Sequence, residues 1–218
     1  MPLRQSIPRP TVKRLSLYLR ELDRVAAGDR TTISSKQLAG ALGLTDAQVR
    51  KDLGCFGQFG RPGIGYSISE LIEELKKTLG TDRQWNAAVV GAGNLGQAVM
   101  AYPRFRSKGF DIVAVFDNDS EKAGKEIEGH HVHPMADLPK LVQERDIRIG
   151  IISVPATAAQ KVANDLIESG VRGILNFAPI RLDVHDAVSV ASVDFSISLE
   201  QLAFQVSLGL TGSLEEAG

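Results

Sequence analysis

The sequence predicts a mostly parallel α/β domain that follows a smaller domain of short helices. An apolar run at residues 87–90 leads directly into a glycine-rich turn at residues 91–96. Apolar strand-like segments then alternate with helical patterns as far as residue 193. Before residue 80 the periodicity is helical, and helix-start signatures follow one another closely. Together these observations are typical of an α/β Rossmann domain preceded by a winged helix-turn-helix domain.

The charge of the chain is unevenly distributed. Residues 1–66 carry 11 Lys and Arg against 5 Asp and Glu, whereas the remainder carries 14 against 21. A basic module joined to an acidic one suggests that the first meets a polyanion. A single cysteine, Cys55, excludes an internal disulfide and a cysteine-rich zinc site. No apolar run approaches the ~18 residues of a membrane span, so we expect a cytoplasmic protein with no membrane partner.

Helix signals organise the first domain. Apolar spacing predicts a helix between residues 10 and 28. Two further helix starts, Ser34 with Gln37 and Thr45 with Gln48, flank Gly43, which suits a left-handed stop. Two short helices joined at a glycine predict a helix-turn-helix.

The third helix has a surface suited to nucleic acid. Its apolar residues share one face and predict the buried side. The other side carries the candidate DNA-binding residues Gln48, Arg50, Lys51 and Gly54. Residues 57–66 hold four glycines and predict a β-hairpin or wing, with Arg61 at its tip and Gly63 beside it. The simpler alternatives are a solvated charged face and a helix that merely ends at Gly54.

Three segments follow from these patterns: a winged-helix domain over residues 1–80, a Rossmann domain over 81–196 and a C-terminal helix over 197–218. In the second we expect five or six strands and, among its helices, one near residues 120–125. The C-terminal helix carries an apolar stripe that needs a cover. Its own domain and a partner subunit remain equal alternatives.

The glycine turn predicts a dinucleotide site. Gly91, Gly93 and Gly96 have the spacing that permits a tight turn, a close pyrophosphate and close helix packing. Asp117 stands 21 residues beyond Gly96, where an acid binds the adenosine ribose hydroxyls and disfavours a 2′-phosphate. The predicted cofactor is therefore NAD(H), and the alternative is a turn that binds nothing. The candidate cofactor-binding residues are Gly91, Ala92, Gly93, Asn94, Leu95, Gly96, Asp117, Tyr102 and the strand ends Val154, Pro155, Asn176, Phe177, Ala178 and Pro179.

Metal and catalytic sites are not predicted. His130, His131 and His133 form a short cluster, yet no carboxylate or cysteine lies at ligand spacing beside them. No arrangement of Ser, His and Asp suggests nucleophilic catalysis, and no acid or base is placed for proton transfer. We therefore assign no catalytic residue and expect a protein that is not an enzyme.

The ordered motifs resemble the Rex family of bacterial redox-sensing transcriptional repressors. They are Val49-Arg50-Lys51-Asp52-Leu53, Phe56-Gly57-Gln58-Phe59-Gly60, Gly63-Ile64-Gly65-Tyr66, the turn 91–96, Tyr102-Pro103, Asn176-Phe177-Ala178-Pro179 and Val193-Asp194-Phe195. The resemblance covers nearly the whole chain. It implies a homodimer that exchanges its C-terminal helix and binds an inverted-repeat operator in double-stranded DNA. In the family, NAD⁺ is compatible with DNA binding and NADH releases the repressor.

The resemblance also implies residue roles. Arg50 and Lys51 match the recognition helix, and Arg61 matches the wing. Arg20, Tyr102 and Asp194 match positions whose hydrogen bonds change with the redox state, and Asp194 joins the cofactor-binding set. An anionic Asp194 would favour the cationic ring of NAD⁺ and, with NADH, would be free to pair elsewhere. Gly54, Gln58 and Pro62 depart from the family pattern, which predicts fewer phosphate contacts from the wing.

Three other functions compete with this interpretation. One is a small NAD-dependent oxidoreductase with an N-terminal regulatory module, which lacks an evident acid or base. A second is a CoA-binding module of the succinyl-CoA synthetase type, against which Asp117 favours a ribose. A third is a regulator that responds to NADP, which Asp117 disfavours.

Overall fold

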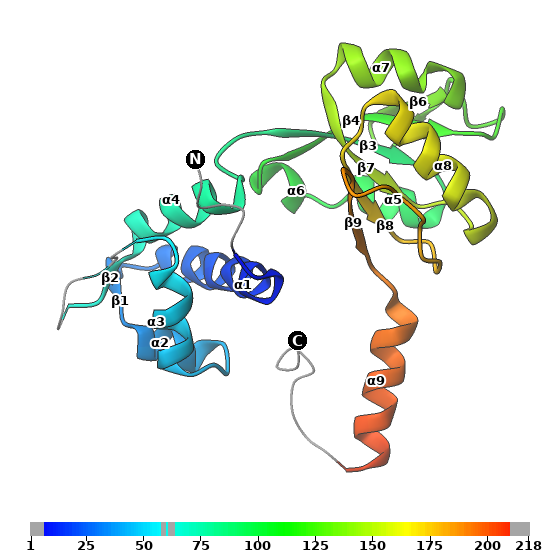
Figure 1. Cartoon of the computed structure of the whole chain (residues 1–218). Helices are drawn as coiled ribbons and strands as arrows, with labels where there is room; N and C mark the ends of the chain where they lie inside the picture. The colour runs from blue at the N-terminus through cyan, green and yellow to red at the C-terminus, as the bar shows by residue number, and fades with distance from the viewer. Residues whose placement is uncertain (1–6, 58–59, 61–63, 210–218) are drawn as a thin grey trace. The chain divides into compact units, whose positions relative to one another are not determined.

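The computed structural model describes residues 7–57, 60 and 64–209. The chain divides into two compact units, with the division between Arg83 and Gln84 (Figure 1). Within the described ranges, no helix is both long and apolar enough to cross a bilayer.

The first unit is built from four helices and a two-stranded antiparallel sheet. Its elements are α1 (Arg9–Ala26), β1 (Thr32–Ile33), α2 (Ser35–Ala41), α3 (Asp46–Gly54), β2 (Tyr66–Ser67) and α4 (Ile68–Leu79). Every helix contributes leucines to one apolar core, in which Leu15, Leu38, Leu53 and Leu71 are each at most 1% exposed. The spacing of these leucines produces the amphipathic pattern from which the helices were predicted.

The predicted helix starts are present. Ser34 Oγ accepts the Gln37 N–H at 3.1 Å, and Gln37 Oε1 accepts the Ser34 N–H at 2.9 Å. Thr45 Oγ1 accepts the Gln48 N–H at 3.1 Å in the same manner. Gly43 between the two helices has φ 67°, a left-handed conformation that favours glycine. The helix-turn-helix is confirmed.

The wing is described only at its base. Ile33 of β1 pairs with Tyr66 of β2, so the end of the glycine-rich segment returns to the chain before α2. Gly65 permits this pairing, because a Cβ there would lie 2.6 Å from the carbonyl oxygen of Ile33. Gln58, Arg61, Pro62 and Gly63 lie outside the described residues, and with them the expected hairpin tip.

The second unit contains a seven-stranded sheet in the order β5-β6-β4-β3-β7-β8-β9. The strands are β3 (Trp85–Val90), β4 (Phe110–Asp117), β5 (Glu126–Ile127), β6 (His130–Pro134), β7 (Ile147–Ile152), β8 (Gly173–Asn176) and β9 (Ser189–Ser192). All pairs are parallel except β5 with β6 at the edge. The order without β5 is that of the Rossmann fold, and it reverses between β3 and β7.

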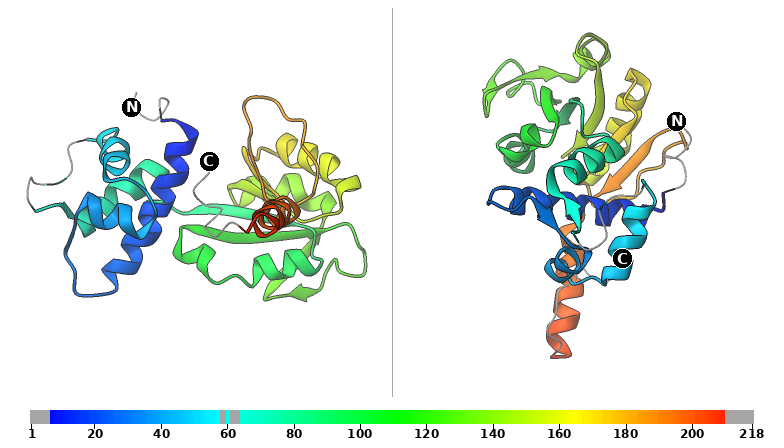
Figure 2. Two further views of the ribbon diagram at one scale, coloured as in Figure 1. Left: turned by 90° about the horizontal axis from the view of Figure 1, so that it is seen from below. Right: turned by 90° about the vertical axis from the view of Figure 1, so that its left-hand side faces the viewer.

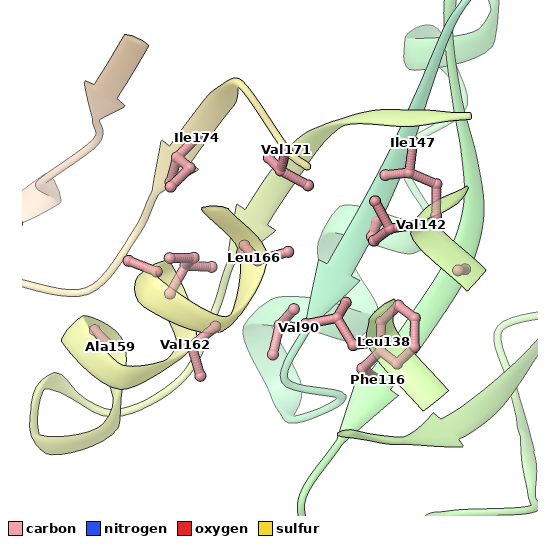
Figure 3. Packing of buried hydrophobic residues seen from close by; sticks show 14 of the residues in the cluster. Val90, Phe116, Leu138, Val142, Ile147, Ala159, Val162, Leu166, Val171 and Ile174 are labelled. Carbon is pink, nitrogen blue, oxygen red and sulfur yellow. The ribbon is translucent and has the colours of Figure 1, made fainter. Parts of the chain in front are cut away.

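Helices cover both faces of this sheet. They are α5 (Asn94–Met100), α6 (Arg104–Ser107), the short 3₁₀ helix η2 (Met135–Asp137), α7 (Leu138–Glu144) and α8 (Ala156–Ser169). One core holds Val90 and Phe116 against Leu138 of α7 and Leu166 of α8 (Figure 3). The other holds the alternate strand residues against α5 and Phe105 of α6. Because both faces are buried, residues 87–90 must all be apolar.

Two expectations about this unit are wrong. The segment expected to form a helix at 120–125 forms only a turn. Asp119 caps that turn through a bond from the Glu121 N–H, and Gly124, with φ 85°, diverts its N–H to Val132. The sheet also has more strands than the expected five or six, because the histidine segment forms β6 and a short partner, β5, pairs with it.

The C-terminal helix α9 (Phe195–Ser207) follows β9 and projects beyond the sheet (Figures 1 and 2). It begins earlier than expected, because Asp194 accepts the Ser196 N–H at 2.9 Å and caps the first turn. None of its residues is buried. Leu199, Leu202 and Val206 of the predicted stripe are 65%, 47% and 70% exposed, so the described chain does not cover them.

Candidate nucleotide and nucleic-acid sites

The predicted recognition helix is α3. Lys51 is exposed on it, and Arg50 donates to Asp46 at 2.6 Å and to Ser35 at 3.3 Å. These two hydrogen bonds link the first turn of α3 to the first residue of α2, and they hold the Arg50 guanidinium at the surface. Gly54 is the last helical residue, and a Cβ there would meet no atom within 4 Å. Packing inside the described chain therefore does not require a glycine at this position.

A buried carboxylate holds α3 against α1. Asp52, on the inner side of α3, is only 2% exposed. Arg14 of α1 donates to both of its oxygens, from Nε at 2.6 Å and from Nη2 at 2.8 Å. Tyr18 of α1 donates its hydroxyl at 2.7 Å, and Gln48 donates its amide at 2.9 Å. Thr11 completes the group at 3.5 Å. The two helices are thus joined by directional bonds as well as by apolar packing.

This group keeps Asp52 ionised. Burial alone would raise the pKa of Asp52, but the hydrogen bonds from Arg14, Tyr18 and Gln48 outweigh it and hold the pKa below its ordinary value. Burial raises the pKa of Tyr18, and the hydrogen bond to Asp52 raises it further. The ion pair is therefore complete at neutral pH.

Sequence reasoning missed this group. The apolar spacing predicts Val49, Leu53 and Phe56 as the inner face. Val49 and Leu53 are buried, and Phe56, beyond the end of α3, is partly buried against the same core. The spacing did not identify Asp52, whose angular position beside them was the available signal. An acid on the inner side of an amphipathic helix needs a buried cation, and Arg14 on the facing helix α1 supplies it.

The glycine turn is a close contact between backbones. Gly91 has φ 102°, and a Cβ on it would lie 2.6 Å from the carbonyl oxygen of Ser153. A Cβ on Gly96 would lie 1.9 Å from the carbonyl oxygen of Gly91. Gly93 differs, since a Cβ there would meet nothing within 4 Å. The chain itself therefore requires Gly91 and Gly96, whereas nothing in the described chain requires Gly93.

Asp117, at the end of β4, holds the turn in place. Its Oδ2 accepts the Ala92 N–H at 2.8 Å and lies 3.2 Å from Lys122 Nζ, and its Oδ1 accepts the Asp119 N–H at 2.9 Å. Burial acts to raise the pKa of Asp117, but these partners outweigh it and lower the pKa. The carboxylate thus positions the turn, and its binding of ribose stays a prediction.

The predicted strand ends lie at the carboxyl edge of the sheet. There β7 lies beside β3, and β8 lies beside β7. The Ser153 N–H donates to Val90, and the Phe177 N–H donates to Ile152. Val154 is half-buried, and Pro155 and Pro179 are exposed. In a Rossmann sheet ligands bind at this edge, near the point where the strand order reverses.

Asn176 and Ala178 shape this edge from inside. Asn176 is 0% exposed, and its amide nitrogen donates to the carbonyl oxygens of Ala178 and Ile180 at 3.1 and 2.9 Å. Its Oδ1 accepts the Ala178 N–H at 3.0 Å. The side chain therefore fixes the loop that carries Phe177 and Pro179, and any direct contact of Asn176 with a ligand remains a prediction.

The three predicted switch residues fall in both units. Arg20 lies on α1, whereas Tyr102 and Asp194 belong to the second unit. Tyr102 is 48% exposed and packs edge-on against Phe105, with ring centroids 5.0 Å apart. Asp194 caps α9, and hydrogen bonds from the Ser196 side chain and backbone lower its pKa. The rings of Phe177 and Phe195 stack, which places the start of α9 beside the loop after β8.

Two family models match successive parts of the chain. The putative DNA-binding protein N-terminus matches residues 6–54, and the CoA binding domain matches residues 82–180. The matches follow the two structural units. They define the class of the chain: a helix-turn-helix domain followed by a Rossmann-type nucleotide-binding domain.

Curated relatives and solved structures give the family. A redox-sensing transcriptional repressor Rex of Carboxydothermus hydrogenoformans is 50% identical over 92% of this chain and 96% of its own length. One of Desulforamulus reducens is 47% identical over 93% and 96%. The crystal structure of RSP in complex with β-NAD⁺ and operator DNA is 35% identical, with a TM-score of 0.89 over 93% of this chain and 94% of that one. RSP in complex with β-NADH is 33% identical, with a TM-score of 0.85 over 94% and 96%. The chain belongs to the family of redox-sensing transcriptional repressors Rex.

We expect Asp52→Ala to destabilise the first unit by about 3 kcal/mol, because it leaves Arg14 and Tyr18 without their buried partner. Amide hydrogen exchange of α1 and α3 measures this, since it resolves the first unit from the second. The matched control is Glu74→Ala, which removes a more exposed ion pair with Lys77 on α4 and should leave exchange unchanged. Equal effects of the two substitutions would contradict the assigned role of Asp52.

The same group predicts a pH dependence. The folded pKa of Asp52 is lowered, so its contribution is present above the unfolded value of about 4 and is lost as the pH falls through the folded value. The folded pKa of Tyr18 is raised, so its contribution is lost as the pH rises above about 10. Exchange protection of α3 should fall at both limits. In Asp52→Asn the acid limb should be smaller, and an acid limb of unchanged size would refute this explanation.

Proposed function

We propose that this chain is a transcriptional repressor that binds an inverted-repeat DNA operator and responds to the redox state of bound NAD(H). NAD⁺, or no ligand, permits operator binding, and NADH releases the repressor. The observation that carries the proposal is the combination, in one chain of the Rex family, of a helix-turn-helix with a Rossmann glycine turn. Relatives in this family have been solved with β-NAD⁺ and operator DNA and with β-NADH.

The DNA-binding surface is centred on α3. Arg50 and Lys51 supply cations for phosphates or base edges, and Gln48 supplies an amide. Gly54, with open space around it, permits close approach at the end of the helix. Arg61 and Gly63 complete the proposed set, although they lie outside the described residues.

The cofactor lies against the turn 91–96 and the carboxyl edge of the sheet. Gly93 leaves space for the pyrophosphate, and Asp117 is at the end of β4, where it can accept bonds from the ribose hydroxyls. A 2′-phosphate would meet this carboxylate, so NAD(H) is preferred to NADP(H). Tyr102 and Phe177 are the residues that we propose to contact the nicotinamide end.

Binding, without catalysis, is the function proposed for this site. The curated relatives are named as repressors, which supports a regulator over an oxidoreductase with a regulatory module. The match to a CoA binding domain reflects the shared Rossmann-type fold, and Asp117 favours a nucleoside ribose over CoA. The nicotinamide then acts as a signal whose charge and ring shape report the redox state.

A second copy of this chain covers α9 in our proposal. A 13-residue helix with no buried residue has apolar side chains that the described chain leaves uncovered. Exchange of α9 between two subunits would bury these side chains and give the two-fold symmetry of an inverted repeat. Asp194 caps this helix, so its proposed redox exchange with Tyr102 or Arg20 would act directly on the start of α9.

The central test is an electrophoretic mobility shift with an inverted-repeat operator selected from random duplexes. We expect a retarded complex without ligand and with NAD⁺, and release of the DNA by NADH. The difference arises because a ligand shifts an equilibrium only by its difference in affinity for the two states. A scrambled duplex is the control for sequence preference. Equal binding with NAD⁺ and NADH would leave a DNA-binding protein but remove the redox response.

The glycine turn gives a matched pair of variants. Gly93→Ala should fold normally and bind NADH at least about tenfold more weakly, because its methyl group occupies the space of the pyrophosphate. Gly96→Ala should lower the melting temperature as well, because its Cβ collides with the Gly91 carbonyl. Calorimetric titration with NADH and thermal unfolding separate the two effects. Unchanged NADH affinity in Gly93→Ala would place the cofactor elsewhere.

The dimer proposal is tested on α9. Leu199→Asp combined with Leu202→Asp should convert the dimer to a monomer, because both side chains belong to the exposed apolar stripe. Gln201→Asp, an exposed polar position on the same helix, should leave the dimer intact. Light scattering coupled to size-exclusion chromatography gives the mass of each variant. A dimer that persists in the double variant would exclude α9 as the interface.

A further inference from the structure

The side chain of Gln48 has a fixed orientation on α3. Its amide nitrogen donates to Asp52 Oδ1 at 2.9 Å, one helical turn further along. Asp52 is bound by Arg14 through both oxygens and by the Tyr18 hydroxyl, so it is an ionised carboxylate that only accepts hydrogen bonds. The group of Gln48 that faces it must therefore be the NH₂ and not the carbonyl. Chemistry alone settles the choice between the two ways of placing this amide.

The carbonyl oxygen of Gln48 is left at the surface. Gln48 is half-buried, and no hydrogen bond to its Oε1 is found within the described residues. If this oxygen were buried, it would be a buried polar atom without a partner. The only such side-chain atom in the part of the chain that the structure describes is Thr81 Oγ1, so Oε1 of Gln48 is accessible to solvent. Lys51 is exposed on the same helix, and Arg50 is held at its surface by Asp46. The helix that carries Lys51 and Arg50 thus also carries an accessible acceptor held in one orientation.

The position of this acceptor has a consequence for base recognition. In the major groove, adenine and cytosine present exocyclic amines, whereas guanine and thymine present carbonyl oxygens at the corresponding place. A fixed carbonyl accepts from the amines and is repelled by the oxygens. It is likewise repelled by phosphate, which leaves phosphate contacts to the cations.

We propose that Asp52 orients Gln48 as a specificity-determining residue, which selects adenine or cytosine over guanine or thymine at one position of each operator half-site. This inference rests on the proposed function and adds the functional group and the class of base. Asp52 itself meets no DNA in this proposal and is a positioning residue. Its ion pair with Arg14 keeps it an acceptor, and through Gln48 that state decides which base is preferred.

The experiment measures base preference position by position. An operator selected by the wild-type full chain is altered to each of the four base pairs at every position of both half-sites. Fluorescence anisotropy at one salt concentration then gives the affinities. For the wild type we expect one symmetric position at which adenine or cytosine on the contacted strand is favoured by about five- to tenfold.

Gln48→Ala should abolish the preference at that position alone and retain the others. Asp52→Asn should weaken the same preference, because its amide can donate as well as accept and so lets Gln48 rotate. Tyr18→Phe removes a different bond to the same carboxylate and should leave the profile unchanged, because both bonds from Arg14 still hold Asp52. Lys51→Ala should weaken all duplexes alike if it contacts phosphate, with a lower salt slope. If Asp52→Asn does not fold, Gln48→Ala still decides the question, because it removes one bond to Asp52 and leaves those from Arg14 and Tyr18 in place.

A Gln48→Ala profile that matches the wild type at every position would overturn the inference and leave the proposed function standing. If Gln48→Ala instead loses a preference for guanine or thymine, the inference is overturned too. In that case the NH₂ group of Gln48 would face the base, and its carbonyl would face inward. A wild-type chain that binds the selected operator and a scrambled duplex equally would refute the proposed function itself, and this inference with it.

Discussion

The first unit depends on the ion pair between Asp52 and Arg14. Apolar packing between α1 and α3 is non-directional and tolerates small rotations of either helix about its axis. The hydrogen bonds from Arg14 and Tyr18 to the Asp52 carboxylate do not tolerate such rotations, because each bond weakens as its angle changes. A buried pair adds little net stability over an apolar one, so its main effect here is to define one rotation of α3. A helix that presents particular side chains to a DNA groove needs such a fixed rotation about its axis.

Asp117 performs a comparable task in the second unit. It is mostly buried at the end of β4, and it accepts the N–H of Ala92 within the glycine turn. Each unit thus uses an anion that is largely shielded from solvent and bound by donors of its own chain to fix the element that is proposed to meet the ligand. The two acids differ in what surrounds them. Asp52 is enclosed by side chains of two helices, whereas Asp117 is bound mainly by backbone N–H groups and Lys122.

The sequence predicted elements whose cause is local. The helix starts at Ser34 and Thr45 and the turn at Gly91 depend on neighbouring residues, and they are where they were expected. The helix expected at 120–125 is wrong because Gly124 bonds to Val132 of β6, a partner that local pattern does not show. The Asp52 group depends on residues 34 to 41 positions apart in the sequence. The roles of the candidate site residues remain predictions, since periodicity locates a face but not the ligand it meets.

The start of α9 brings the two proposed functions of the second unit together. Phe195, its first residue, stacks on Phe177, which follows β8 at the edge proposed for the nicotinamide. Asp194 caps the same turn through the Ser196 N–H. If Asp194 turns to another partner when the cofactor is reduced, it must release this cap, so the change weakens the first turn of α9. Because α9 has no buried residue within the described chain, the change would reach the second subunit that is proposed to cover it. A helix that packed on its own domain could absorb the shift locally, whereas a helix shared between subunits would transmit it to the spacing of the two DNA-binding units.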